Sequence, residues 1–184
     1  MQAKLSRIRS WLVPEVVQTS AMDCGPAVLK CLLAGYGIHI HYGRLREACQ
    51  TDLDGTSIDT LEEVAGRLGL LAEQVMLPPD QVLLPELHAL PAILILKLPD
   101  GATHFVLVWR RLGPLVQVMD PATGRRWMSC RQLTSQMYVH RQRVPADAWR
   151  EWAESEEFQA ALRRRLQRLG LGRHARPLLN QALE

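Results

Sequence analysis

The chain has 184 residues, of which 47% are apolar, and its formal net charge is +3. A chain of this length can bury one hydrophobic core and add a short further segment, and its nearly balanced charge predicts no nucleic-acid partner. The longest apolar stretch, Leu90–Leu96, is far shorter than the roughly 20 residues that a membrane-spanning helix needs.

Near the N-terminus, three basic residues precede the short apolar run Trp11–Val13, which Pro14 and Glu15 end before it reaches the length of a signal peptide. We therefore expect a cytosolic chain. Its four cysteines show no CxxC spacing, and cytosolic thiols stay reduced. Neither a disulfide framework nor a zinc site is predicted.

The first predicted helix opens near Cys24 and ends at the turn Gly35–Gly37, because glycine commonly follows a helix C-terminus. Pro26 suits the first turn, where its missing N–H has no intrahelical partner. Cys24 then lies at the helix N-terminus, where the helix dipole favours a thiolate. A cysteine at a helix start is nevertheless more often an inert core residue, so its neighbours must support a catalytic role.

Gln18 stands six residues before Cys24. Its side-chain amide can donate to the oxyanion of a tetrahedral intermediate, with the backbone N–H of Cys24 as the second donor. Taken alone, Gln18 would be interpreted as a solvated loop residue. It has catalytic meaning only together with Cys24.

Two further helices are predicted over residues 42–48 and 57–68, and Thr56 with Asp59 has the form of a capping box before the second. After Gly69 the pattern changes to short apolar runs separated by Pro, Gly and Asp, which is typical of strands. The predicted strands are Leu71–Met76, Ala89–Leu98, Thr103–Arg110, Leu115–Asp120, Arg126–Cys130 and Met137–Arg143. Helices followed by neighbouring strands indicate an α+β fold.

Of the six histidines, only His104 begins a predicted strand beside a candidate orienting acid. The loop Arg111–Gly113 has the glycine that a three-residue hairpin favours. If residue 110 faces residue 114, then His104 faces Asp120 on the same side of the sheet, roughly 5 Å away. A bulge at Pro114 would shift the register by one and separate the pair. The alternative interpretation is a surface ion pair across two strands.

Together these residues predict a thiol mechanism. His104 takes the proton of the Cys24 thiol, Cys24 attacks a carbonyl, and His104 later protonates the leaving group. Asp120 fixes the tautomer and orientation of the imidazole. Gln18 and the backbone N–H of Cys24 hold the oxyanion.

Other polar clusters give weaker signals. His39 and His41 alternate on a short segment without a nearby third ligand, so no metal site is predicted. Cys31 follows Cys24 by two helical turns, roughly 10 Å, which is too far for a disulfide and favours core packing.

From Pro145 the sequence becomes helical and rich in aromatic and basic residues. We expect a domain over residues 1–145 and a helical appendage, or a linker toward a missing transmembrane domain, over residues 146–184. Six of its arginines gather toward its C-terminal part: Arg163, Arg164, Arg165, Arg168, Arg173 and Arg176. They are predicted either to contact anionic lipid or a transporter surface, or to form a solvated helix face.

Three segments in this order, Gln18–Ala27, His104–Val108 and Asp120–Gly124, closely resemble the bacteriocin-processing cysteine peptidases. The resemblance covers about residues 12–143. Members of that family usually form the N-terminal cytosolic domain of peptide-exporting ABC transporters. The resemblance implies a papain-like fold, with an N-terminal helical half packed on an antiparallel sheet half.

The resemblance also implies a function: removal of the leader of a ribosomally made precursor peptide after a double-glycine-type motif, coupled to export. Gln18, Cys24, His104 and Asp120 match the family's site residues one by one. The expected partners are the precursor peptide and the transmembrane and ATP-binding domains of an exporter, at the inner face of the membrane. The sequence has no GxxxxGK[ST] phosphate loop. No cofactor is therefore expected for the peptidase, ATP would belong to a missing domain, and the chain would be an excised domain or a free-standing peptidase.

Two alternatives stay open at this point. One is a module that docks a leader peptide without cutting it, as degenerate relatives lacking the nucleophile do. The other is a papain-like acyl transferase or thiol hydrolase with a different substrate, since the same triad serves many acyl transfers.

Overall fold

The structure is a computed structural model, and it describes residues 10–53, 55–141, 143–168 and 170. The chain divides into two compact units, Met1–Val139 and His140–Glu184. The boundary expected after residue 145 therefore lies inside the second unit. Among the described residues, no helix is both long and apolar enough to cross a membrane.

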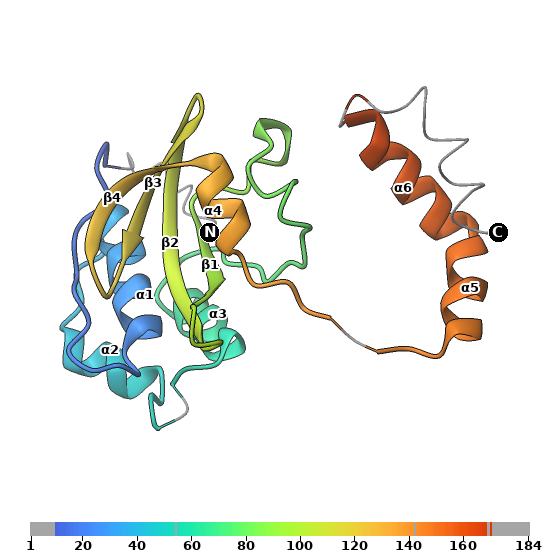
Figure 1. Cartoon of the computed structure of the whole chain (residues 1–184). Coiled ribbons are helices and arrows are strands. Elements are labelled where there is room, and N and C mark those ends of the chain that lie inside the picture. The colour runs from blue at the N-terminus through green and yellow to red at the C-terminus, as the bar shows by residue number, and fades with distance from the viewer. Residues whose placement is uncertain (1–9, 54, 142, 169, 171–184) are drawn as a thin grey trace, which may run out of the picture. The chain divides into compact units, whose positions relative to one another are not determined.

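Three helices form the first half of the first unit: α1 (Cys24–Gly35), α2 (Tyr42–Ala48) and α3 (Ile58–Arg67) (Figure 1). All three were predicted. The capping box expected from Thr56 is wrong, because Ser57 has the extended backbone of an N-cap residue and its hydroxyl accepts the Thr60 N–H at 3.1 Å. The Thr56 hydroxyl instead shares a hydrogen bond with Thr51.

The second half is a four-stranded antiparallel sheet whose strand order is β1-β2-β3-β4 (Figure 1). The strands are β1 (Ala92–Lys97), β2 (Thr103–Leu112), β3 (Leu115–Asp120) and β4 (Gly124–Ser129). Helices that precede a sheet of sequential antiparallel strands confirm the predicted α+β class.

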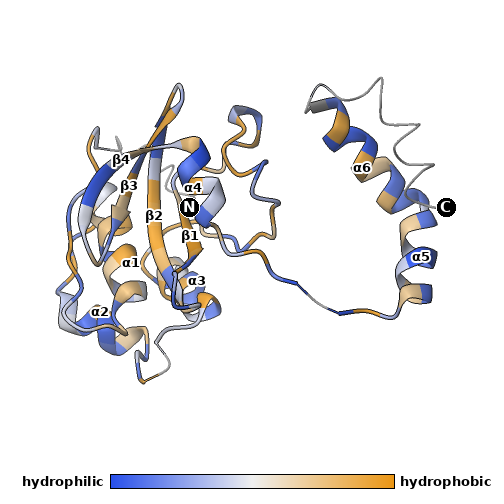
Figure 2. Ribbon diagram, in the orientation of Figure 1, coloured by the Kyte–Doolittle hydropathy of each residue, from blue (hydrophilic) through white to orange (hydrophobic). Residues whose placement is uncertain are grey.

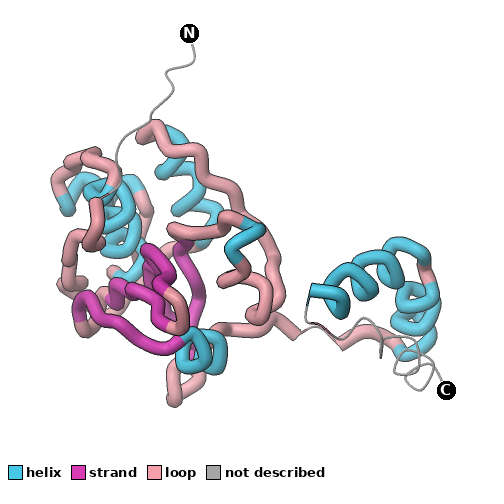
Figure 3. Tube along the Cα trace, turned by 90° about the horizontal axis from the view of Figure 1, so that it is seen from above, coloured by secondary structure: helices cyan, strands magenta, loops and turns pink. Residues whose placement is uncertain are grey.

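Two predicted strands are wrong. Leu71–Met76 lies in a long irregular stretch between α3 and β1 that is almost all loop, apart from the short 3₁₀ helix η1 (Pro85–Leu87) (Figure 3). Leu71 and Met76 are strongly exposed, so this apolar run has no sheet to join. The described residues of Met137–Arg143 form one isolated bridge, from Met137 to Leu96, and no strand.

A helix replaces the end of another predicted strand. The chain turns into α4 (Cys130–Gln136) directly after β4. Ser129 and Gln132 form a reciprocal capping box there, which satisfies N–H groups at the start of the helix. Cys130, expected as the last residue of a strand, is therefore the first residue of this helix.

The β2–β3 hairpin differs from the predicted one in its turn and its register. Leu112 pairs with Leu115, so the turn has two residues, Gly113 and Pro114, instead of three. Farther from the turn Val108 pairs with Val118, and the register shifts between Val108 and Arg110. Trp109 is the extra residue of this β-bulge.

Apolar side chains fill both faces of the sheet. One face packs against α1 through Leu107, Trp109 and Met119, and the other packs against Leu133 of α4 through Val106 and Val118. A third cluster lies among α1, α2 and α3. The apolar residues follow α1 and the central strands in Figure 2. The sheet is therefore fixed from two sides, which holds the strand ends that contain the candidate site.

The second unit contains α5 (Ala146–Glu154) and α6 (Glu156–Arg168). Trp152 and Phe158 pack with ring centroids 4.5 Å apart, and Trp149 adds a second ring contact to each of them. Residues 171–184, including Arg173 and Arg176, lie outside the described residues.

Candidate active site

Cys24 is the first residue of α1. The helix begins here because the Asp23 carbonyl accepts the first intrahelical bond, from the Ala27 N–H at 3.1 Å, and Pro26 needs no partner in the first turn. The sulfur is therefore close to N–H groups that have no intrahelical acceptor.

The Cys24 thiol interacts with the imidazole of His104 across the two halves of the unit. Burial raises the pKa of Cys24, but hydrogen bonds with the His104 side chain and the Phe105 and Gly25 backbone lower it. The net effect is a pKa below the usual value of 9.0. This thiol is more acidic than that of an ordinary cysteine, whereas burial raises the pKa of Cys31 to about 12.

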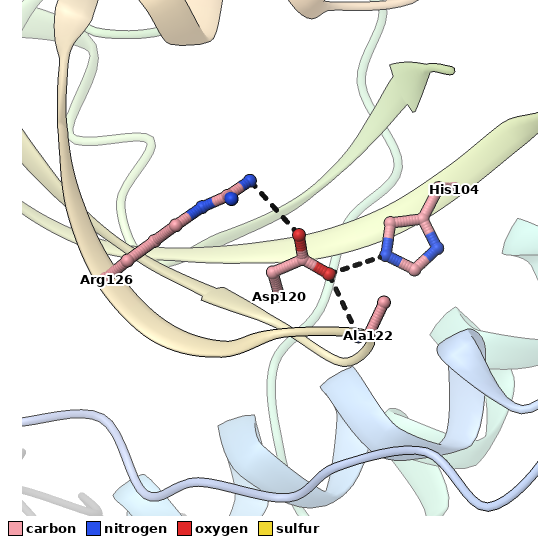
Figure 4. Close-up of polar contacts among 4 residues, drawn as sticks. All are labelled: His104, Asp120, Ala122 and Arg126. Carbon is pink, nitrogen blue, oxygen red and sulfur yellow. Dashed lines mark hydrogen bonds and ion pairs between the residues drawn. The ribbon is translucent and has the colours of Figure 1, made fainter. Parts of the chain in front are cut away.

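His104 lies at the start of β2, and its Nε2 is 2.8 Å from Oδ1 of Asp120 at the end of β3 (Figure 4). Both residues are buried, with 7% and 6% of their surface exposed. Hydrogen bonds to Asp120 and then to Cys24 raise the pKa of His104 to about 9. Burial opposes ionisation of Asp120, but its hydrogen bonds with His104 and Ala122 lower its pKa to about 2. A charged imidazolium–carboxylate pair is thus stable near neutral pH.

The same-side placement of this pair depends on the bulge at Trp109. If the pairing of Leu112 with Leu115 continued without a shift, Leu107 would face Asp120 and His104 would point to the opposite side. The bulge moves the register by one residue and returns His104 to the side of Asp120. The predicted direct pairing of the two residues is therefore wrong, although their predicted shared side is correct.

Asp120 has two further hydrogen bonds, as Figure 4 shows. The Ala122 N–H donates to Oδ1 at 2.9 Å, and Nη2 of Arg126 donates to Oδ2 at 3.1 Å. Sequence reasoning missed Arg126. Arg126 pairs with Val118 across β3 and β4, so it lies on the same side of the sheet as Asp120. A prediction of how these two strands pair would have revealed it.

Gln18 lies next to the segment that follows Asp120. Its backbone N–H donates to the Pro121 carbonyl at 2.9 Å, which joins the N-terminal loop to the end of β3. Its side-chain Oε1 is buried and has no hydrogen-bond partner among the described residues.

A second buried carboxylate, Asp23, directly precedes Cys24, and sequence reasoning missed this one as well. Its Oδ1 accepts from Nε of Arg46 and its Oδ2 accepts from the Thr19 hydroxyl, both at 2.7 Å. Burial raises the pKa of Asp23, but the hydrogen bonds with Thr19, Arg46 and Ser20 more than compensate and lower it. The signal in the sequence was weak, because Arg46 belongs to a different helix.

Within the described ranges, no three His, Cys, Asp or Glu side chains are arranged to hold a metal ion. His39 and His41, considered above as ligands, line a small, mostly apolar pocket together with Lys30 and Leu33.

Comparison with known proteins gives a consistent result. Residues 13–139 match the Peptidase C39 family. The chain is 32% identical over 110 residues to the lactococcin-G-processing and transport ATP-binding protein LagD of Lactococcus lactis subsp. lactis. It is 29% identical over 113 residues to the pediocin PA-1 transport/processing ATP-binding protein PedD of Pediococcus acidilactici. These alignments cover 60% and 61% of this chain but only 16% of each relative.

Two solved structures have the same fold. The peptidase domain of Streptococcus ComA, a bifunctional ABC transporter involved in quorum sensing, superposes with a TM-score of 0.56 and 26% identity, over 68% of this chain and 92% of that domain. A double glycine motif protease from an AMS/PCAT transporter, solved with its leader peptide, gives a TM-score of 0.58 at 24% identity, over 72% and 89% of the two chains. The helical half and the antiparallel sheet thus form the expected papain-like fold. Because residues 13–139, more than half of its length, match that family, the chain belongs to the Peptidase C39 family, a family of cysteine peptidases.

Proposed function

We propose that this chain is a cysteine endopeptidase in which Cys24 is the nucleophile, His104 the general base and acid, and Asp120 the residue that orients His104. The observation that carries the proposal is the continuous interaction from the Cys24 thiol through the His104 imidazole to the Asp120 carboxylate. Each member has a pKa shifted in the direction that its role requires.

The two pKa shifts favour a thiolate–imidazolium pair in the resting site, because the pKa of Cys24 is lowered and that of His104 is raised to about 9. Asp120 accepts a hydrogen bond from Nε2 of His104, which leaves Nδ1 to exchange a proton with the thiol. Asp120 therefore selects the tautomer and stabilises the positive charge.

In the reaction, the sulfur of Cys24 attacks the scissile carbonyl carbon and forms a tetrahedral intermediate. The oxyanion accepts hydrogen bonds from the side-chain amide of Gln18 and the backbone N–H of Cys24. His104 gives its proton to the leaving amine as the C–N bond breaks, and a thioester remains. A water molecule, deprotonated by His104, then attacks the thioester, and the released thiolate restores the resting pair.

The buried Oε1 of Gln18 supports this role. With the carbonyl end of the amide enclosed, the NH₂ end is the part that is available to a substrate. The hydrogen bond from Gln18 N–H to the Pro121 carbonyl holds the residue beside the Asp120 loop.

For the substrate, we propose a ribosomally made precursor peptide that is cut after a double-glycine-type motif. The names of LagD and PedD describe processing and transport, and the solved AMS/PCAT protease binds its leader peptide. The family membership supports the extension of this substrate class to our chain. Transmembrane and ATP-binding domains of an exporter are the proposed partners, which gives a cytoplasmic location at the inner face of the membrane. ATP would bind only to such a partner domain.

The test is to incubate the full chain with a synthetic precursor peptide that contains a Gly–Gly junction, and to follow the products by mass spectrometry. We expect one cut directly after the second glycine. Cys24→Ala should abolish cleavage. Cys130→Ala is the matched control, because this second partly exposed thiol lies at the start of α4 and should be dispensable.

Two results would contradict the proposal. A peptide that binds but stays intact, beside an active control peptidase, would indicate a docking module. Rapid alkylation of Cys24 by iodoacetamide without cleavage of any peptide tested would indicate an acyl transferase or a hydrolase with another substrate.

A further inference from the structure

The carboxylate of Asp23 is fully buried, with 0% of its surface exposed, and the proposed mechanism does not use it. A buried carboxylate is costly unless both oxygens are paired and hydrogen-bonded. Both oxygens of Asp23 are: Oδ1 with Arg46 and Oδ2 with Thr19. A group that is stabilised so completely next to the nucleophile needs an explanation beyond the folding of α1.

The two partners of Asp23 come from different segments. Thr19 is adjacent to Gln18 in the N-terminal loop, and Asp23 is adjacent to Cys24 at the helix start. A single hydrogen bond of 2.7 Å therefore joins the neighbours of the two proposed oxyanion donors. The Asp23 N–H also donates to the Ser20 carbonyl at 3.2 Å, which closes the turn between them.

Arg46 fixes the other side of this carboxylate from α2. The Arg46 side chain is about half exposed, and its positive charge balances the negative charge of the Asp23 carboxylate beside the thiol. The hydroxyl of Tyr42 lies in the same surroundings, and burial and then the charge of Asp23 raise its pKa, so it remains neutral. The charged form of Asp23 is thus held in one orientation by groups on two elements.

We infer that Asp23 is a positioning residue for the oxyanion hole. It sets the position of the Gln18 side-chain amide relative to the Cys24 backbone N–H by binding the Thr19 hydroxyl, while Arg46 holds the carboxylate in place. This inference rests on the proposed function, because it assigns Asp23 a role only if Cys24 and Gln18 act in catalysis.

A merely structural role of Asp23 would change the ionisation of the Cys24 thiol and the position of the oxyanion donor together. The thiolate of Cys24 is set by His104 and nearby N–H groups, so it should not depend on Asp23. The oxyanion donor depends on the Thr19–Asp23 link. Loss of that link should lower kcat while KM and the rate of Cys24 alkylation stay near the wild-type values.

The experiment measures kcat and KM of the full chain on the synthetic Gly–Gly peptide for Asp23→Asn, Thr19→Val and Gln18→Ala, alone and combined. Gln18→Ala should lower kcat by roughly 100-fold to 1000-fold, as expected for one oxyanion donor. Thr19→Val should lower it on the order of tenfold to 100-fold, because the donor is misplaced. The decisive variant is Thr19→Val with Gln18→Ala, whose kcat should equal that of Gln18→Ala alone.

Thr19→Val keeps the Asp23–Arg46 ion pair and replaces a hydroxyl by a methyl group, so it decides the question even if Asp23→Asn fails to fold. Glu63→Gln is the control, since it removes an exposed ion pair with Arg67 on α3 and should leave kcat unchanged. Wild-type kcat in Thr19→Val, multiplicative losses in the double variant, or a parallel fall in alkylation would each overturn the inference. If the wild-type chain itself leaves the peptide intact, the proposed function fails and the inference falls with it. If the wild-type chain cuts and Thr19→Val cuts equally well, only the inference fails.

Discussion

The two halves of the first unit bring their site residues together in different ways. Gln18 and Cys24 lie six residues apart in the helical half, and the side chain of Asp23 links the segment between them. His104 and Asp120 lie 16 residues apart in the sheet half, and they meet only because two strands pair in one register. A lost side chain in the helical half moves a donor slightly. A lost register in the sheet half would turn His104 away from Asp120.

The sheet half therefore depends on a backbone irregularity. The bulge places Trp109 in the core, where its indole N–H donates to the Ser10 carbonyl at 2.9 Å and its ring packs edge to face with Tyr36. Gly35, the last residue of α1, lies against the same ring. The contacts that fix the register thus come from the helical half, so the two halves are not independent.

The largest expected effect comes from breaking the polar pair in the sheet half without moving a strand. Asp120→Asn should lower kcat on the Gly–Gly peptide by two to four orders of magnitude. An amide can present its NH₂ to Nε2 of His104, which favours the wrong tautomer and removes the charge that stabilises the imidazolium. Steady-state kinetics on the full chain would measure this.

The fold should tolerate that substitution, because asparagine has the same shape. A circular dichroism spectrum like that of the wild type would show it. Full activity in Asp120→Asn would contradict the role given to Asp120. A loss confined to KM would also contradict it, because it would indicate a substrate contact.

The second effect acts on the link between the halves. A Cβ at Gly35 would lie 2.8 Å from Cζ2 of Trp109, too close for any carbon contact. Gly35→Ala should therefore lower the free energy of unfolding by roughly 1–3 kcal/mol, although alanine in a helix is normally favoured over glycine by about 1 kcal/mol. Gly66→Ala in α3 is the matched control, since open space surrounds that position, and it should be neutral or stabilising.

Urea denaturation of both variants measures the difference. If the bulge depends on the position of Trp109, Gly35→Ala should also lower kcat under conditions in which it is fully folded. Equal stabilisation by both alanines would mean that Trp109 can move at little cost, and that the register has another source.

The contrast between the halves also explains what the sequence could predict. The helix α1 follows from an apolar run with Pro26 in its first turn and Gly37 after its end, and α3 is followed by Gly69, which are local signals. The strand Leu115–Asp120 was predicted with its observed bounds. The prediction that His104 and Asp120 lie on the same side of the sheet was correct. It was correct only because the predicted register differs from the real one near those residues by an even number of positions.

The remaining features depend on contacts that are distant in sequence. No local pattern marks Trp109 as a bulge, because its partners are Ser10 and residues of α1. Nothing local in the sequence links Arg46 to Asp23 or Arg126 to Asp120, because α2 and β4 bring these arginines to their partners. The helix α4 was a different kind of error, since Ser129 with Gln132 has a capping-box pattern that was present in the sequence.

The third expected effect is a dependence of kcat/KM on pH. In the proposed mechanism the active form contains the Cys24 thiolate and the His104 imidazolium, and the pKa of His104 is raised to about 9 by Asp120 and then by Cys24. We expect kcat/KM to fall by about tenfold per pH unit above that pKa, because the proton for the leaving amine is lost. An alkaline limb near pH 6.5 in the pH–rate profile would mean that Asp120 and Cys24 do not stabilise the imidazolium.

The smallest effect concerns the third partner of the buried acid. Arg126 is 44% exposed, and half-exposed ion pairs contribute about 0.2–1 kcal/mol, so Arg126→Met should lower kcat by at most about fivefold. Arg125→Met is the matched control, because Arg125 pairs with Glu15 and not with Asp120. A loss as large as that of Asp120→Asn would mean that the Arg126 contact orients the carboxylate more than the bond to His104 does. Equal activity in both arginine variants would mean that His104 and the Ala122 N–H alone hold Asp120, and that the sheet half needs no charge outside the strand pair.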